Sequence, residues 1–123
     1  AEHLAAEDGR HAIIAQIEDR EALANLAAIA SVEHIDCLLV GRADLAVSLG
    51  AERLDDPRVE SAVTQVIDAA ARAGKASGLF VASLEDLDRF AARGVSFFIL
   101  ASDQAVLRTG WSQHARHFRS AAH

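Results

Sequence analysis

The stretch that decides the fold is Leu38-Leu39-Val40-Gly41-Arg42-Ala43-Asp44-Leu45. Its apolar run ends at Gly41, and a carboxylate, Asp44, follows three residues later. A buried strand carries no polar side chains, so in parallel α/β folds the ligand-binding groups lie at the carboxyl ends of the strands. Gly41 lets the backbone turn tightly and approach a ligand closely. Unpaired backbone N–H groups where the next helix starts favour an anion, although Asp44 acting only as a helix cap is the alternative interpretation.

On both sides of this stretch, apolar runs alternate with segments whose apolar residues recur at helical spacing. The predicted strands cover residues 12–17, 35–40, 76–80 and 97–101. The predicted helices cover residues 20–30, 42–49, 57–73 and 84–93, with a last one from 103 to about 120. Because strict alternation implies right-handed crossovers, the sequence predicts an α/β fold with a parallel sheet.

Several helix boundaries carry local signals. Asp56 followed by Pro57 is typical of an N-cap and a first helical residue. Ser83, with Asp86 three residues later, resembles a capping box. Asp103 is expected to cap the last helix. Glycines that end helices are expected at Gly74 and Gly94.

The predicted strands are apolar at consecutive positions, as in residues 37–40 and 97–100. Such strands are buried on both faces of their sheet. The predicted helices carry one apolar stripe each, so they cover only one of the two faces. The other face of the sheet needs cover from elsewhere.

The composition describes a globular protein or part of one: 123 residues, 51% of them hydrophobic, with a net charge of −6. The acidic balance argues against nucleic acid or an anionic membrane as a partner. No apolar run approaches the ~20 residues of a membrane span. The single cysteine, Cys37, lies inside an apolar run and is expected to be a buried structural thiol. Without a disulfide within the chain, a cytoplasmic location is expected.

Polar side chains follow three of the predicted strands: Gln16 and Glu18 after the first, Asp44 after the second, and the Ser102-Asp103 pair after the fourth. Carboxylates from neighbouring strand ends are the usual protein ligands of Mg²⁺ or Mn²⁺, and water and substrate oxygens complete the octahedron. The sequence therefore suggests a divalent metal site at this edge of the sheet.

Several motifs, in this order and spacing, resemble the HpcH/HpaI aldolase family of metal-dependent pyruvate aldolases. The resemblance covers nearly the whole chain. The motifs are Gln16-Ile17-Glu18, Asn25, Ile35-Asp36, Val40-Gly41-Arg42-Ala43-Asp44-Leu45, Ser48-Leu49-Gly50, Pro57-Arg58-Val59, Ala73-Gly74-Lys75, Ser77-Gly78-Leu79, Gly94-Val95 and Ser102-Asp103. The family's fold is a TIM (β/α)₈ barrel, and the resemblance implies that residues 1–123 are its C-terminal (βα)₄ half.

The resemblance implies a role for each site residue. Glu18 and Asp44 match the family's two ligands for a divalent metal, Mg²⁺ or Mn²⁺, with Co²⁺ as a further candidate. Gln16 matches a residue that contacts the bound 2-oxo acid. Ala43 and Asp44 match the loop whose backbone N–H groups hold the pyruvate carboxylate, beside Gly41. The implied reaction cleaves a 4-hydroxy-2-oxo acid to pyruvate and an aldehyde, with the metal stabilising the enolate.

The chain departs from the family pattern at three places. Arg42 stands where the family usually has proline, which adds a cation beside the metal loop and puts the substrate preference in doubt. Glu33-His34 replaces a more usual Pro-Gly turn. The family's catalytic histidine and enolate-stabilising arginine belong to the first half of the barrel, and no residue here corresponds to them.

The expected partners are a small 2-oxo acid and the missing cover of the sheet, which is either an N-terminal half-barrel or a second copy of this chain in a homo-oligomer. Two alternative functions remain open at this stage. One is a non-catalytic half-barrel that binds ligands or serves in assembly. The other is an acyl-CoA lyase of the citrate lyase β and malyl-CoA lyase group, because a family resemblance does not define the substrate.

Overall fold

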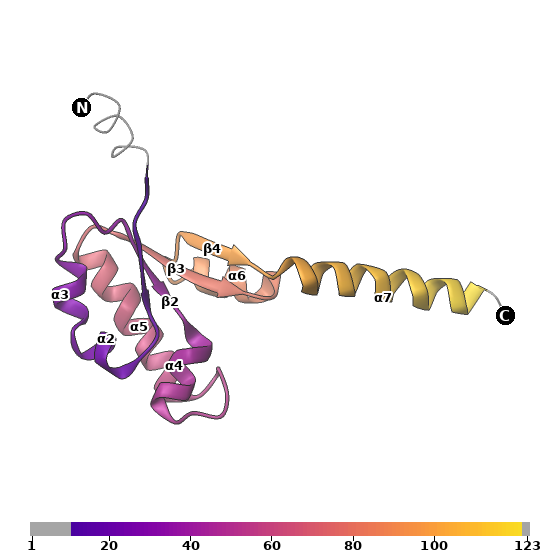
Figure 1. The fold of residues 1–123 in the computed structure, drawn as a ribbon, viewed down its shortest axis with the longest axis horizontal. Coiled ribbons are helices and arrows are strands. Elements are labelled where there is room, and N and C mark those ends of the chain that lie inside the picture. The colour runs from indigo at the N-terminus through magenta and orange to yellow at the C-terminus, as the bar shows by residue number, and fades with distance from the viewer. Residues whose placement is uncertain (1–10, 122–123) are drawn as a thin grey trace.

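The computed structural model describes residues 11–121 and shows one parallel sheet in the strand order β1-β2-β3-β4 (Figure 1). The strands are β1 (Ile14–Ile17), β2 (Cys37–Val40), β3 (Ala76–Val81) and β4 (Phe97–Leu100). The helices are α2 (Arg20–Ala24), α3 (Leu26–Ala30), α4 (Arg42–Leu49), α5 (Pro57–Arg72), α6 (Leu84–Ala91) and α7 (Asp103–Ala121). The predicted α/β alternation and parallel pairing are confirmed.

The predicted helix over residues 20–30 is wrong in one respect, because it forms two short helices that meet at Asn25. The Asn25 side chain donates a hydrogen bond to the Glu21 carbonyl oxygen at 2.9 Å. Asparagine side chains compete in this way with the helical backbone, and they favour turns and helix ends. Apolar spacing alone does not detect such a break.

The N-cap residues expected at the starts of α5 and α6, Asp56 and Ser83, are confirmed. Asp56 accepts a hydrogen bond from the Arg58 backbone N–H at 2.9 Å, and the Arg58 guanidinium also bonds this carboxylate. These bonds lower the pKa of Asp56 to about 2. At α6, Ser83 Oγ accepts from the Asp86 N–H at 3.1 Å. Gly74 and Gly94 follow α5 and α6 with φ of 67° and 92°, conformations that glycine adopts without steric cost.

The cap of α7 is Ser102, and the predicted cap Asp103 is the first residue of the helix. Ser102 Oγ accepts from the Ala105 N–H at 3.2 Å, whereas Asp103 Oδ1 accepts only from its neighbour Gln104. The preceding residue, Ala101, has a φ of 51°, which is unusual for a residue with a side chain. Because both Ser and Asp are good N-caps, the pair alone did not indicate which of them would cap the helix.

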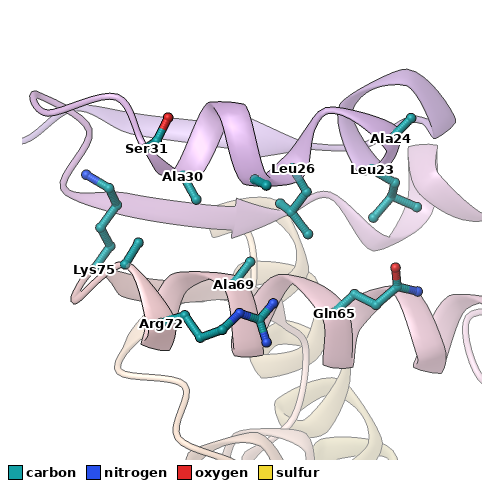
Figure 2. Close-up of a pocket in the computed structure, with 11 residues that line it drawn as sticks. Leu23, Ala24, Leu26, Ala30, Ser31, Gln65, Ala69, Arg72 and Lys75 are labelled. Carbon is teal, nitrogen blue, oxygen red and sulfur yellow. The ribbon is translucent and has the colours of Figure 1, made fainter.

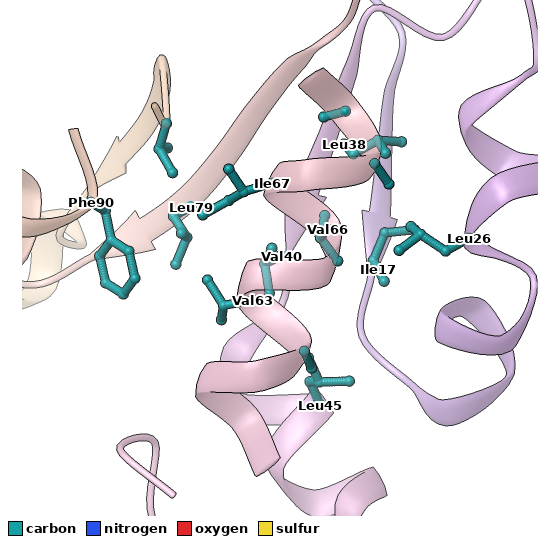
Figure 3. Packing of buried hydrophobic residues seen from close by; sticks show 14 of the residues in the cluster. Ile17, Leu26, Leu38, Val40, Leu45, Val63, Val66, Ile67, Leu79 and Phe90 are labelled. Carbon is teal, nitrogen blue, oxygen red and sulfur yellow. The ribbon is translucent and has the colours of Figure 1, made fainter. Parts of the chain in front are cut away.

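The hydrophobic core lies between one face of the sheet and the helices, and α5 contributes most of its helical part (Figure 3). On the sheet side, Ile17, Val40 and Leu79 lie in one row of the strand register and are almost fully buried. Burial of such side chains contributes roughly 1.5–3 kcal/mol each. The buried residues of α5 are Val59, Ala62, Val63, Val66, Ile67, Ala69 and Ala70.

The opposite face of the sheet has no helix over it within residues 11–121. The register places Gln16, Leu39, Gly78 and Phe97 in one row on this face. Most of its large side chains are exposed as the sequence predicted, in contrast to the buried row beneath α5, whereas Leu39 is only 8% exposed. The exposed fractions are 39% for Ile14, 45% for Phe80, 36% for Phe97 and 41% for Ile99.

The last helix, α7, projects away from the rest of the described chain (Figure 1). None of its residues is buried, and Trp111 and Phe118 are 74% and 75% exposed. Leu100, at the end of β4, is also 58% exposed. The apolar surfaces of α7 and β4 therefore lack cover from the part of the chain that the structure describes. No helix within residues 11–121 is long and apolar enough to cross a membrane.

Candidate functional site

The site predicted from the sequence begins where β1 and β2 end side by side. Ile17 pairs with Val40 in the register, and the Gly41 N–H donates to the Ile17 carbonyl oxygen at 3.0 Å. Glu18, the residue that follows β1, therefore lies beside Gly41. Gln16 lies on the same face of the sheet, because side chains two residues apart on a strand point the same way.

The structure brings Gln16, Glu18 and Gly41 into contact. Gln16 Nε2 donates a hydrogen bond to Glu18 Oε2 at 2.5 Å. A Cβ atom added to Gly41 would lie 2.8 Å from Glu18 Cβ, 2.9 Å from Gln16 Nε2 and 3.0 Å from Glu18 Oε2. Atoms do not approach so closely, so only glycine fits here. Glycine is required at position 41 because of this close approach. Its backbone conformation does not require glycine, since a φ of −84° is open to any residue.

Helix α4 starts directly after Gly41, which is its N-cap residue. No side chain of the cap residue bonds the backbone N–H groups of the first turn. Asp44 lies in the first turn, and Ala43 and Asp44 are exposed. The capping interpretation of Asp44 is therefore wrong. The first intrahelical bond runs from the Leu45 N–H to the Gly41 carbonyl oxygen, so the N–H groups before Leu45 have no acceptor within the helix.

The two predicted metal ligands, Glu18 and Asp44, come from neighbouring strand ends. Within residues 11–121, no group of three or more His, Cys, Asp or Glu side chains could hold a metal ion. Neither Glu18 nor Asp44 belongs to the carboxylates that pair with arginines in this part of the chain. Two carboxylates without a cationic partner suit a hard divalent cation whose other ligands are water and substrate oxygens.

Arg42 does not lie where the sequence suggested. Its side chain is only 8% exposed and points away from the metal loop, toward α6. Arg42 Nη2 donates to the Phe80 carbonyl oxygen at 3.1 Å and to Asp86 Oδ2 at 3.2 Å. The guanidinium carbon also lies 4.9 Å from the centre of the Phe90 ring. The sequence identified Asp86 only as part of a cap signal and carried no sign of this ion pair.

The polar residues after β4 do not join the group at β1 and β2. Strand β3 separates β4 from β2 in the sheet, and Ser102 and Asp103 bond to the start of α7. Cys37 is buried as predicted, and burial raises the pKa of its thiol. A raised pKa disfavours the reactive thiolate and agrees with a structural role.

A shallow groove of about 590 Å³ lies between α3 and α5, on the helix-covered side of the sheet (Figure 2). Its lining includes the apolar side chains of Leu23, Leu26, Ala30 and Ala69, together with Arg72. The groove contains none of the predicted site residues. It therefore belongs to the outer surface of the fold and is not part of the candidate site.

A model of the HpcH/HpaI aldolase/citrate lyase family matches residues 2–109. Among curated proteins, the chain is 32% identical over 120 residues to the 5-keto-4-deoxy-D-glucarate aldolase of Shigella boydii, covering 97% of this chain and 47% of that protein. It is 32% identical over 123 residues to the hydroxypyruvate/pyruvate aldolase of Pseudomonas aeruginosa, covering 99% and 46%. The chain thus spans about half the length of the curated relatives it matches.

Solved structures show the same half-length match. The HpcH/HpaI aldolase of Desulfitobacterium hafniense superposes with a TM-score of 0.86 at 26% identity, covering 96% of this chain and 46% of that one. A family protein of Burkholderia cenocepacia gives a TM-score of 0.82 at 32% identity, covering 88% and 42%. The (βα)₄ unit described above corresponds to about half of these TIM barrels. The chain belongs to the HpcH/HpaI aldolase/citrate lyase family.

Proposed function

We propose that this chain is the C-terminal half of a metal-dependent aldolase, which cleaves a 4-hydroxy-2-oxo acid to pyruvate and an aldehyde. The observation that carries the proposal is the close packing of Gln16, Glu18 and Gly41 beside the start of α4. Two curated relatives at 32% identity are aldolases of oxo acids, which supports the same reaction class.

Each group of the site has a proposed role. Glu18 and Asp44 hold the divalent metal, Mg²⁺ or Mn²⁺, which when bound supplies a Lewis acid for the oxo-acid substrate. The hydrogen bond from Gln16 orients the Glu18 carboxylate, and the remaining amide hydrogen of Gln16 is available to the substrate. The free N–H groups of Ala43 and Asp44 bind the substrate carboxylate at the positive end of the α4 dipole.

The general base and the enolate-stabilising arginine of the proposed reaction come from the other half of the barrel. A positioned acid–base group contributes typically 10²–10⁴-fold to a rate. Catalysis therefore requires the N-terminal half-barrel, and the active unit is a complete barrel or an oligomer of such barrels. The proposed location is the cytoplasm.

A lyase of the citrate lyase β type is the second candidate within the family. The citrate lyase β subunit of M. tuberculosis, solved with oxaloacetate and magnesium, shares the fold with a TM-score of 0.63 at 18% identity. The aldolase structures superpose better and at higher identity. We therefore propose aldol cleavage as the main activity.

The test is metal binding by Glu18→Gln and Asp44→Asn variants of the protein that carries this chain in a complete barrel. Titration of Mn²⁺ followed by electron paramagnetic resonance gives the affinity, and pyruvate release gives the activity. Changes around a metal site that leave its ligands in place already cost 10–100-fold. We expect each variant to lose at least as much in Mn²⁺ affinity.

The matched controls are Glu21→Gln on α2 and Asp68→Asn on α5, which remove an exposed carboxylate that is not one of the two proposed ligands. Both controls are expected to titrate Mn²⁺ like the unmodified protein. Unchanged titration curves for the Glu18 and Asp44 variants would show that the site assignment is wrong.

A further inference from the structure

Arg42 is tied to two elements that flank the proposed substrate loop, which comprises residues 41–44. It is the first residue of α4, directly between Gly41 and Ala43. Its Nη2 atom bonds the carbonyl oxygen of Phe80 near the carboxyl end of β3, and Asp86 Oδ2 in the first turn of α6. One side chain therefore links the start of α4 to β3 and α6.

Burying the Arg42 side chain would be energetically unfavourable if the side chain contributed only to packing. Arg42 is 8% exposed, and its Nε atom has no hydrogen-bond partner among the described residues. An unsatisfied polar atom in the interior destabilises a fold, and an apolar side chain of similar size would avoid the cost. The ring of Phe90, at 4.9 Å, offsets part of this cost through a cation–π contact.

Apart from Arg42, the contacts of the substrate loop fix it to β1 but not to β3. The Gly41 N–H bonds the Ile17 carbonyl oxygen, which fixes the loop to β1. Gly41 has no side chain, and Ala43 and Asp44 are exposed to solvent. Among the residues of the substrate loop, only Arg42 reaches toward β3 and α6 through its side chain.

We infer that Arg42 and Asp86 form a positioning pair for the substrate loop. The pair holds the N–H groups of Ala43 and Asp44 where they meet the carboxylate of a 2-oxo acid, and it does not touch the substrate itself. This inference rests on the proposed function. Because its guanidinium points away from the site, Arg42 acts by fixing the geometry of the loop.

The experiment compares Arg42→Ala, Asp86→Asn and the double variant in the complete barrel. Calorimetry measures the affinity for pyruvate at saturating Mn²⁺, and kinetics separate KM from kcat in the aldol direction. Misplacement of binding groups by about 1 Å costs up to ~100-fold. We expect each single variant to weaken pyruvate binding about ten- to a hundredfold. Mn²⁺ affinity should fall less, because Glu18 follows β1 and keeps its position while only Asp44 moves with the loop.

Because the two residues act as one unit, the double variant should bind pyruvate no more weakly than the weaker single variant. The matched control is Arg93→Ala. Arg93 also stacks on Phe90, at 5.0 Å, but its guanidinium bonds Glu60 and Thr64, and not Asp86 or the substrate loop. This control should unfold at a lower denaturant concentration and bind pyruvate normally.

The outcomes separate the inference from the proposed function. If the unmodified barrel does not bind pyruvate with Mn²⁺, the proposed function is wrong and the inference falls with it. If the unmodified barrel binds pyruvate and both single variants bind it equally well, only the inference is wrong. A loss of pyruvate affinity in Arg93→Ala as large as in Arg42→Ala would also overturn it. If Arg42→Ala does not fold, Asp86→Asn decides the question.

Discussion

Gly41 shows how a single residue controls the candidate site. Its missing side chain leaves room for Glu18 Cβ and for the amide of Gln16, both of which would lie within 3 Å of an added Cβ. Glu18 Cβ is bonded directly to the main chain, so it cannot rotate away. A larger residue at this position must therefore displace the strand or the loop.

A Gly41→Ala substitution is accordingly expected to weaken Mn²⁺ binding by at least tenfold, the lower end of the effect of disturbed metal surroundings. The overall fold should survive, because the clash is local. Manganese titration measures the affinity, and circular dichroism checks the fold. Gly110→Ala on α7 is the control, since an added Cβ there meets nothing within 4 Å. Normal manganese binding by Gly41→Ala would contradict the proposed geometry.

At the scale of elements, α6 enters the hydrophobic core through Phe90, and the partly buried Leu87 also packs against this core. Phe90 is fully buried and is the only buried residue of α6. Three guanidinium groups, from Arg42, Arg89 and Arg93, lie between 4.3 and 5.0 Å from the centre of its ring. Glu60 and Asp86 pair with these arginines, so the ring lies within a network that joins α4, α5 and α6.

Replacing Phe90 by alanine should lower the free energy of unfolding by about 3–5 kcal/mol, because it leaves a cavity and removes the aromatic face from the guanidinium groups. Urea unfolding measures the change. Phe118→Ala is the control, since that phenylalanine is 75% exposed on α7 and should change stability by less than about 0.5 kcal/mol. Equal effects of the two substitutions would contradict the assignment of Phe90 to the core.

At the scale of the whole molecule, the bare face of the sheet determines how the isolated chain behaves. Phe80, Phe97 and Ile99 are each more than a third exposed, and α7 presents Trp111 to solvent. Contiguous apolar surface of this kind is rare on soluble monomers and marks an interaction surface. The chain matches only about half the length of its relatives, and we propose that the remaining half of a barrel covers this face in the whole protein.

The isolated 123-residue chain is therefore expected to associate at micromolar concentration, with a mass by light scattering above the 13.1 kDa of one copy. Phe80→Glu places a charge on the bare face and should reduce the association. Val47→Glu is the control, since Val47 is 79% exposed on α4, and its association should match that of the unmodified chain. A compact 13.1 kDa particle that binds no hydrophobic dye would contradict this prediction.

The sequence by itself determined the features that depend on local chemistry and periodicity. Alternating apolar runs and helical stripes defined the four parallel strands, since period and length distinguish buried strands from amphipathic helices. The Asp56 and Ser83 caps follow from side chains that bond backbone groups two or three residues away. The exposure of Phe80 and Ile99 followed from strands apolar on both faces with helices for only one.

Only the tertiary structure decided the features that depend on residues far apart in the chain. Arg42 lies 44 positions before Asp86, and no local pattern links the two, so the sequence suggested a free cation beside the metal loop. The contact of Gly41 with Glu18 likewise requires the pairing of β1 and β2. Both depend on how neighbouring strands and helices pack, because long-range contacts arise from the fold as a whole and not from any one segment.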